Sequence, residues 1–253
     1  MTERQWALVL GASSGFGEAA SVAFAHAGFD IYGVHMDLRD TLPNARRVEE
    51  RVREAGREAV FFNVNAADDA KRAEVIGAIR GPVRILLHSL AFGVLRPVTG
   101  EAAVNRRQLE ATCDAMGHSL LYWARDLVAA GLMPEGGRIF AMTSTGGARA
   151  VPSYGPVSAA KAALEAHVRQ LAIELAPRRI TANAILAGVT DTPALRKIPG
   201  FEKLVEAALD RNPHGRLTAP EDVAKCLVAL ANPDTYWMTG NTIRIDGGEG
   251  TVG

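Results

Sequence analysis

Ala7-Leu-Val-Leu10, followed directly by Gly11-Ala-Ser-Ser-Gly15-Phe-Gly17, is the stretch of sequence that decides the fold. The apolar run has the length of a buried strand, and the glycine-rich turn opens a helix that extends to about residue 26. Glycines let such a turn bend tightly and approach a pyrophosphate, whose charge then lies at the amino end of the helix. The spacing Gly-x-x-x-Gly-x-Gly differs from Gly-x-Gly-x-x-Gly, and a glycine cluster alone is often a plain turn. In this strand–turn–helix context it predicts nucleotide binding.

Short apolar runs and amphipathic stretches alternate along the rest of the chain. Strands are expected at residues 7–10, 31–34, 59–63, 84–88, 137–142, 180–185 and 242–246. Helices are expected at residues 17–26, 44–55, 70–79, 107–130, from Tyr154 to about 175, at 202–210 and at 220–231. Strands that are apolar throughout and alternate with helices indicate a parallel sheet covered on both faces. The right-handed crossover rule then predicts an α/β fold, a doubly wound, Rossmann-like sheet. Without a linker or repeat, residues 1–253 form one expected domain.

The composition gives no sign of binding to nucleic acid or to a membrane. The 253 residues carry a net charge of zero, and the pI is near 7.0. Cys113 and Cys226 lack metal-ligand or Cys-x-x-Cys spacing, which favours a reducing compartment. The first residues run into an apolar strand without signal-peptide features, and no apolar run has membrane-spanning length. We expect a cytoplasmic protein and assign no metal.

Tyr154 and Lys161 form the second informative feature. They are seven residues apart, close to two helical turns, so a helix would place both side chains on one face. A phenol and an ammonium on one face make a proton donor and its electrostatic support. Tyr and Lys recur at helical spacing by chance, and a surface ion pair is the alternative for Lys161. The glycine turn earlier in the chain favours the catalytic interpretation.

Several segments together resemble the short-chain dehydrogenase/reductase family over essentially the whole length. They are the glycine turn, the Tyr–Lys pair, Asn183-Ala-Ile-Leu-Ala-Gly188 and Ile245-Asp-Gly-Gly248. Most members of that family carry the catalytic Tyr four residues before the Lys, where this chain has Val157. Tyr154 looks like the displaced tyrosine of the enoyl-acyl-carrier-protein reductases, and Met116 replaces the Asn of the usual proton relay. Both departures favour an enoyl reductase over a ketoreductase.

Further segments resemble the type III, NADPH-dependent enoyl reductase. They are His88-Ser-Leu-Ala-Phe-Gly93, which is similar to enoyl reductases in general, and residues 93–98, 160–166 and 191–195. Ser144 stands where the type I enzyme carries a second Tyr. The resemblance implies hydride transfer from NAD(P)H to an enoyl thioester, on acyl carrier protein, in fatty-acid or related biosynthesis. It also implies a homotetramer, because family members commonly bury the long helix and the Tyr–Lys helix against copies of themselves.

The resemblance implies a role for each site residue. Tyr154 would donate to the thioester oxyanion and Lys161 would hold the nicotinamide ribose, while Ser144 either bonds the substrate carbonyl or caps a loop. The expected cofactor-binding residues are Gly11, Ser13, Ser14, Gly15, Phe16, Gly17, His35, Arg39, Asn63, Val64, Ser89, Ala91, Lys161, Gly188, Val189, Thr190 and Thr192. A turn-forming Asn is the alternative for Asn63, and ordinary loop threonines for the last two.

The end of the second strand should select the cofactor, because an acid there binds the ribose 2′-hydroxyl of NAD. His35 occupies that place, and Arg39 could meet a 2′-phosphate. This favours NADPH. Asp37 could be either a solvated loop residue or the acid that selects NAD, so NADH stays an alternative cofactor.

Residues 192–217 follow the sixth strand and are expected to form a mobile substrate lid. Arg196 and Lys197 within it could meet an acidic carrier protein, although solvated charges are the commoner explanation. For His88, a structural or cofactor-adjacent role is favoured over metal binding. Two rival functions stay open: a ketoreductase or alcohol dehydrogenase of the same family, and a non-catalytic nucleotide-binding regulator.

Overall fold

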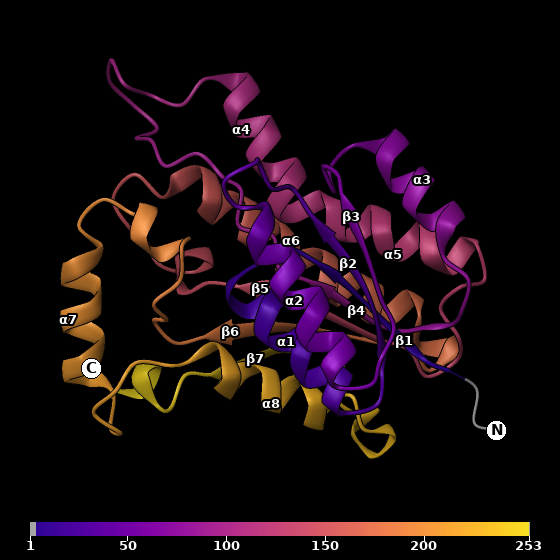
Figure 1. Ribbon diagram of the computed structural model, residues 1–253. Helices are drawn as coiled ribbons and strands as arrows, with labels where there is room; N and C mark the ends of the chain where they lie inside the picture. The colour runs from indigo at the N-terminus through magenta and orange to yellow at the C-terminus, as the bar shows by residue number, and fades with distance from the viewer. Residues whose placement is uncertain (1–3, 253) are drawn as a thin grey trace.

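A seven-stranded sheet forms the centre of the protein in the computed structural model, which describes residues 4–252 (Figure 1). The strands are β1 (Trp6–Leu10), β2 (Asp30–His35), β3 (Ala59–Asn63), β4 (Val83–His88), β5 (Arg138–Thr143), β6 (Thr181–Ala187) and β7 (Thr242–Ile245). They lie in the order β3-β2-β1-β4-β5-β6-β7, and every pairing is parallel. The predicted doubly wound fold is confirmed. The strand order reverses between β1 and β4, and ligands bind at such a switch point beyond the carboxyl ends of the strands.

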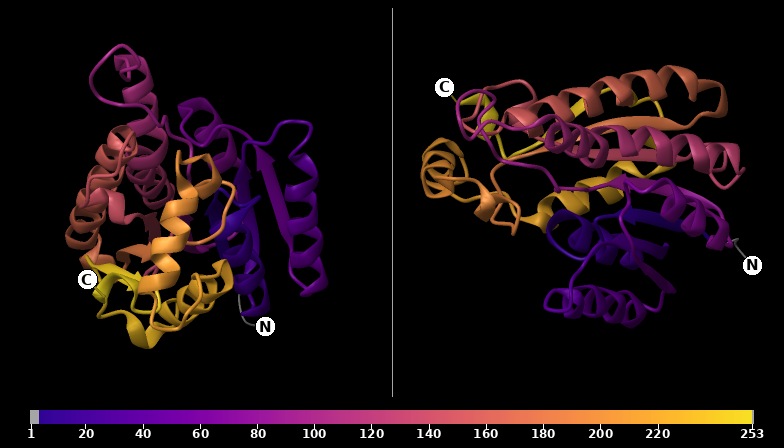
Figure 2. Two further views of the ribbon diagram at one scale, coloured as in Figure 1. Left: turned by 90° about the vertical axis from the view of Figure 1, so that its left-hand side faces the viewer. Right: turned by 90° about the horizontal axis from the view of Figure 1, so that it is seen from above.

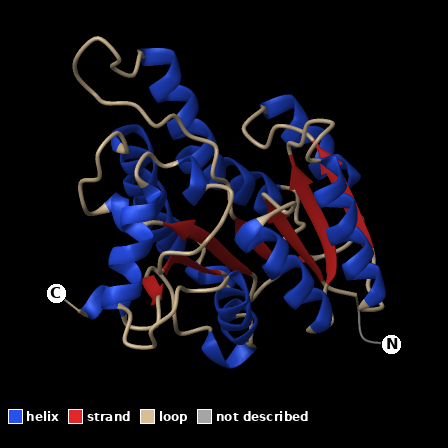
Figure 3. Cartoon of the chain, turned by 60° about the vertical axis from the view of Figure 1, so that its left-hand side comes forward, coloured by secondary structure: helices blue, strands red, loops and turns tan. Residues whose placement is uncertain are grey.

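Helices cover both faces of the sheet (Figures 2 and 3). One face carries α1 (Gly15–His26), α2 (Leu42–Glu54) and α8 (Pro220–Leu230). The other carries α3 (Asp69–Ala78), α5 (Ser119–Ala129) and α6 (Gly155–Glu174), and α4 (Arg106–Cys113) packs against α6. α7 (Phe201–Arg211) lies apart from the sheet, beyond the end of β6.

The strand β1 shows why two helical layers are needed. Its side chains point alternately to opposite faces, as strand geometry requires. Ala7 and Val9 pack into the core under α1, α2 and α8, whereas Leu8 and Leu10 pack into the core under α5 and α6. All four are fully buried, so neither face of β1 can be left to solvent.

The predicted element boundaries agree with the structure to within a few residues, with one exception. The expected helix at 107–130 is interrupted by a π-helical turn, Asp114–His118, between α4 and α5. This turn packs closely on α6, because a Cβ on Gly117 would lie 2.7 Å from the carbonyl oxygen of Ala160. Such π turns are frequent at functional sites.

The Tyr–Lys helix, α6, begins directly after Tyr154. Tyr154 lies at the N-cap position of α6, and its carbonyl accepts the hydrogen bond from the N–H of Ser158. The two-turn spacing to Lys161 therefore persists. Among the helices described here, none is both long enough and apolar enough to span a bilayer.

Candidate active site

A cavity of about 580 Å³ lies at the carboxyl ends of the strands. Of the predicted site residues, Gly17, Arg39 and Asn63 do not line it. The cavity is lined by Gly11, Ser13, Ser14, Gly15, Phe16, His35, Val64, Ser89, Ala91, Ser144, Tyr154, Lys161, Gly188, Val189, Thr190 and Thr192. Five separate loops thus bring the predicted residues together at one edge of the sheet.

The glycine turn fits a bound pyrophosphate. Gly11 has a φ of 89°, and a Cβ there would collide with the carbonyl oxygen of Ser89. Gly17 is needed for packing, because its Cβ would collide with the carbonyl of Gly11. The Ser14 side chain makes no capping hydrogen bond, so the first N–H groups of α1 remain available to an anion.

The end of β2 carries a buried His–Asp pair. His35 Nδ1 lies 2.8 Å from Asp37 Oδ2, and the His35 side chain is 4% exposed. Asn63 binds the backbone of Asp37 through both ends of its amide, with each bond at 2.9 Å. Asn63 therefore holds the loop that follows β2, and its predicted adenine contact stays a prediction, because its amide keeps a second N–H and a second lone pair. Arg39 is exposed on the same loop.

Tyr154 and Ser144 form the hydroxyl pair of the site. The Tyr154 hydroxyl donates to Ser144 Oγ at 3.3 Å, and Ser144 Oγ also accepts from the N–H of Gly146 at 3.2 Å. Burial raises the pKa of the Tyr154 phenol, and the contact with Ser144 partly offsets this. The phenol is therefore protonated at neutral pH and able to donate. Ser144 both caps its loop and orients the phenol.

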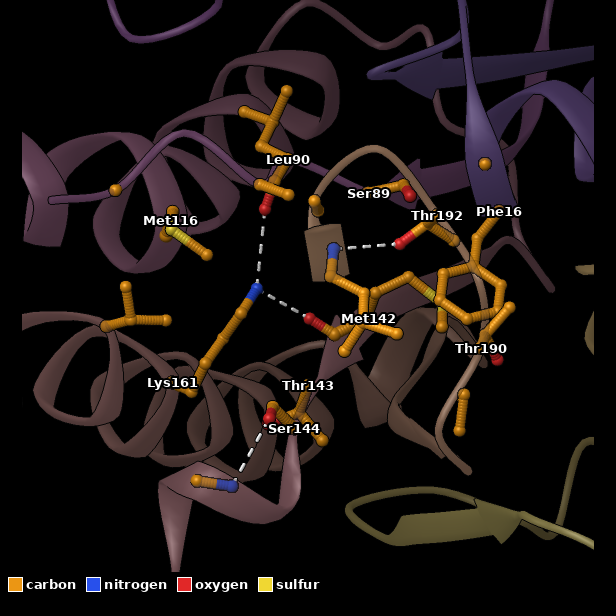
Figure 4. A pocket seen from close by; sticks show the side chains of 18 of the residues that line it. Phe16, Ser89, Leu90, Met116, Met142, Thr143, Ser144, Lys161, Thr190 and Thr192 are labelled. Carbon is orange, nitrogen blue, oxygen red and sulfur yellow. Dashed lines mark hydrogen bonds between the residues drawn. The ribbon is translucent and has the colours of Figure 1, made fainter. Parts of the chain in front are cut away.

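Lys161 is buried, with 4% of its surface exposed, which rules out the surface ion pair. Its Nζ donates to the carbonyl of Met142 at 2.7 Å and lies 3.5 Å from the carbonyl of Leu90 (Figure 4). Burial lowers the pKa of Lys161 to about 8, against a smaller raising effect of Glu165. The ammonium is mostly charged at neutral pH. The sequence could not predict that the backbone carbonyls of Met142 and Leu90 would contact Lys161, because every residue type has a backbone carbonyl.

His88 connects β4 to the π turn. Its Nε2 lies 2.8 Å from Ser119 Oγ, and that hydroxyl donates to the carbonyl of Ala115 at 2.9 Å. Because the Ser119 proton is used, His88 Nε2 carries the hydrogen and donates it. Burial lowers the pKa of His88 to about 3, so the ring is neutral. Within residues 4–252, no three His, Cys, Asp or Glu side chains gather as a metal site.

Apolar side chains form the wall of the cavity near Tyr154, and sequence analysis did not single most of them out. Met116 and Val157 are 4% and 3% exposed and both pack against Gly93, where a Cβ would come within 2.7 Å of the Met116 sulfur and 2.8 Å of Val157. The other apolar lining residues include Phe92, Leu95, Val151, Ile198 and Leu204. The two positions that lack the usual polar residues are therefore packed as hydrophobic wall.

The predicted lid segment contributes one side of the cavity. Leu195, Lys197 and Arg211 line it. Arg196, in contrast, makes two hydrogen bonds of 2.7 Å to Asp191 on the surface. Of the two cations considered for carrier binding, only Lys197 faces the cavity without such a pair.

Comparison with known proteins supports this picture. A family model described as Enoyl-(Acyl carrier protein) reductase matches residues 11–249. The chain is 32% identical over 195 residues to enoyl-[acyl-carrier-protein] reductase [NADPH] FabI of Staphylococcus aureus, covering 76% of this chain and 75% of that protein. It is 31% identical over 251 residues to acetoacetyl-CoA reductase of Rhizobium meliloti, covering 96% and 97%. The crystal structure of enoyl-[acyl-carrier-protein] reductase (NADH) from Aquifex aeolicus VF5 superposes with a TM-score of 0.84 at 25% identity, covering 99% and 97%.

By name, the two enoyl reductases use NADPH and NADH respectively, and the third relative reduces acetoacetyl-CoA. The type III subgroup and the choice of NADPH therefore stay predictions. The family match, the sheet order and the glycine turn agree with one another. The chain belongs to the short-chain dehydrogenase/reductase family, as an NAD(P)H-dependent oxidoreductase of the enoyl-acyl-carrier-protein reductase type.

Proposed function

We propose that the protein reduces the carbon–carbon double bond of an enoyl thioester, carried on acyl carrier protein, in fatty-acid or related biosynthesis. The observation that carries the proposal is the phenol of Tyr154, held by Ser144 beside an apolar wall in which Met116 and Val157 replace polar residues. The phenol is a hydrogen-bond donor for a developing oxyanion, and those two positions offer no polar relay.

The residues present fit a nicotinamide dinucleotide. The glycine turn and the amino end of α1 would hold its pyrophosphate, and Lys161 and the loop after β6 would hold the nicotinamide end. When bound, the cofactor supplies the hydride that adds to the β-carbon of the substrate. We favour NADPH, because His35 occupies the place of the NAD-selecting acid and Arg39 lies on the same loop.

Tyr154 stabilises the negative charge that develops on the thioester oxygen. Its one hydroxyl hydrogen, which the structure directs at Ser144 Oγ, turns to that oxygen when substrate binds, in a water-poor environment where such a bond is stronger than in water. Lys161 adds a positive field beside the phenol and is fixed by the Met142 carbonyl. The apolar wall excludes water from the reacting carbons.

The lid and the mouth of the cavity suit a carrier-bound substrate. Leu195, Ile198 and Leu204 offer apolar contact to an acyl chain, and Lys197 offers a positive charge to an acidic carrier surface. We propose that residues 192–217 close over the substrate.

The test measures cofactor consumption with crotonyl thioester and with acetoacetyl thioester, each on acyl carrier protein and on coenzyme A. The proposal predicts turnover of the crotonyl substrate and little of the acetoacetyl substrate. Turnover of acetoacetyl thioester alone would contradict it.

A ketoreductase is the second candidate, favoured by the acetoacetyl-CoA reductase that matches nearly the whole chain. Such an enzyme must protonate an alkoxide, so Tyr154→Phe should abolish its turnover almost completely. An enoyl reductase retains a measurable part, because the thioester oxygen needs stabilisation rather than full protonation in the hydride step.

A further inference from the structure

The C-terminal turn, residues 246–251, closes one side of the cavity and contains two buried carboxylates. Asp246 is 7% exposed, accepts from the N–H groups of Gly248 and Gly250, each at 3.0 Å, and lies 3.6 Å from the guanidinium of Arg244. Glu249 is 8% exposed and lines the cavity. Its carboxylate reaches out of the turn, to the loop that follows β6.

Glu249 holds this loop by its backbone. Its Oε2 accepts a hydrogen bond of 2.9 Å from the N–H of Val189, whose carbonyl accepts from the N–H of Thr218 at 3.2 Å. Gly188 packs against the side chains of Glu249 and Thr218. A Cβ on Gly188 would come within 2.8 Å of Glu249 Oε2 and would collide with the Thr218 hydroxyl. Glu249 and Thr218 therefore fix the loop from two sides.

The loop held in this way carries predicted cofactor-binding residues. Thr190 is 5% exposed and donates its hydroxyl hydrogen to the Gly188 carbonyl at 3.0 Å. Thr192 Oγ1 accepts from the N–H of Leu195 at 3.2 Å, at the start of the lid segment. Both backbone groups of Val189 are occupied within the chain, so this residue shapes the loop and leaves its neighbours to contact a ligand.

The same turn also reaches the far end of the lid. Asn212, directly after α7, donates its side-chain amide to the carbonyl of Asp246 at 3.2 Å and accepts from the N–H of His214 at 2.9 Å. Residues 246–249 are thus a shared anchor for the cofactor loop and for the lid helix.

We propose that Glu249 is a positioning residue for the nicotinamide cofactor, and that it acts by accepting the Val189 N–H and so fixing residues 188–192. The inference rests on the proposed cofactor binding and adds to it a residue from the last turn of the chain. Within residues 4–252, no basic side chain lies within ion-pair distance of Glu249. The acceptor oxygen is therefore the functional group, and an amide oxygen can replace it.

The experiment compares Glu249→Ala, Glu249→Gln and Thr251→Ala with the wild type. The dissociation constant of reduced cofactor is measured by fluorescence titration without substrate, and Tm is measured with and without cofactor. Thr251 is the matched control, because its hydroxyl donates to the Gly248 carbonyl at 2.7 Å in the same turn but does not line the cavity.

Glu249→Ala should weaken cofactor binding about tenfold or more, since it removes the side-chain partner of the part-buried Val189 N–H and so releases the loop. Glu249→Gln should bind within about threefold of the wild type, because it keeps an acceptor. Thr251→Ala should lower Tm and leave the dissociation constant unchanged. At saturating cofactor, kcat of Glu249→Ala should be close to that of the wild type, whereas its KM for the cofactor should be raised.

Wild-type cofactor affinity in Glu249→Ala would overturn the inference and leave the proposed function standing. So would equal losses of affinity in Glu249→Ala and Thr251→Ala. Failure of the wild type to bind either NADPH or NADH would overturn both together.

Discussion

Gly146→Ala tests the position of the phenol without removing it. Gly146 lies in the turn Thr145–Gly147, directly against the ring of Tyr154. Its φ is not in the left-handed region, so the backbone accepts alanine. The new Cβ would collide with Tyr154 Cε1 and lie 2.6 Å from Cδ1, whereas ordinary contact begins at 3.4 Å, so the ring must move by at least about 0.8 Å.

The size of the effect follows from that displacement. A misplacement of roughly 1 Å at the reacting group costs about 10²-fold in rate, and the 3.3 Å contact with Ser144 would be lost as the ring moves. We expect kcat on the enoyl thioester to fall about 10²-fold. Overpacking should also lower stability by about 1–3 kcal/mol, or roughly 2–4 °C in Tm per kcal/mol.

The assay compares steady-state kinetics, cofactor titration and thermal unfolding with those of Gly81→Ala. Gly81 lies before β4, at the opposite edge of the sheet, where a Cβ would come within 2.6 Å of Trp6 Nε1. Both variants should lose stability, but only Gly146→Ala should lose kcat, and cofactor affinity should be unchanged in both. Equal kcat losses in the two variants, or no loss in Gly146→Ala, would refute the reasoning.

Three further predictions follow from the buried and exposed charges. Because burial lowers the pKa of Lys161 to about 8, kcat/KM should fall as pH rises above about 8 and the ammonium is lost, and Lys161→Gln should lack this pH limb. The pKa of His88 is about 3 when folded and about 6.5 when unfolded, so the folded state binds fewer protons and stability should fall as pH drops from 6.5 towards 3. Urea unfolding of His88→Gln should show a smaller dependence on pH over that range, and an unchanged dependence would contradict a buried neutral ring. Arg39→Ala should weaken NADPH binding about tenfold in a fluorescence titration and leave NADH binding unchanged, whereas equal effects on both would show that Arg39 meets no 2′-phosphate.

The fold could be predicted because its signals are local. Alternating apolar strands and amphipathic helices, together with the turn at Gly11 and Gly17, determine the parallel sheet and its binding edge. The π turn could not be predicted, because it depends on the approach of Gly117 to the Ala160 carbonyl in a distant helix. The periodic pattern of apolar residues predicts which face of a helix is buried, but it does not predict how closely two helices pack.

The site divides in the same way. Tyr154, Lys161 and Ser144 were found from spacing and from a family resemblance, and the structure brings them to one cavity. Asn63 was assigned to the adenine, which stays a prediction, and its two bonds to the backbone of Asp37 could not be foreseen because they join residues 26 positions apart. Glu249 was missed, because a single acid in a glycine-rich turn carries no periodic signal and its partner lies 60 residues away.

The central claim is that the hydroxyl of Tyr154 stabilises charge on the thioester oxygen. The direct test is the single-turnover rate of crotonyl thioester reduction by cofactor-saturated wild type and Tyr154→Phe. Removal of one such donor costs about 10²–10³-fold in other enzymes, so the variant should be slower by that factor with unchanged cofactor affinity. A Tyr154→Phe enzyme that reduces the enoyl thioester at the wild-type rate would contradict the claim.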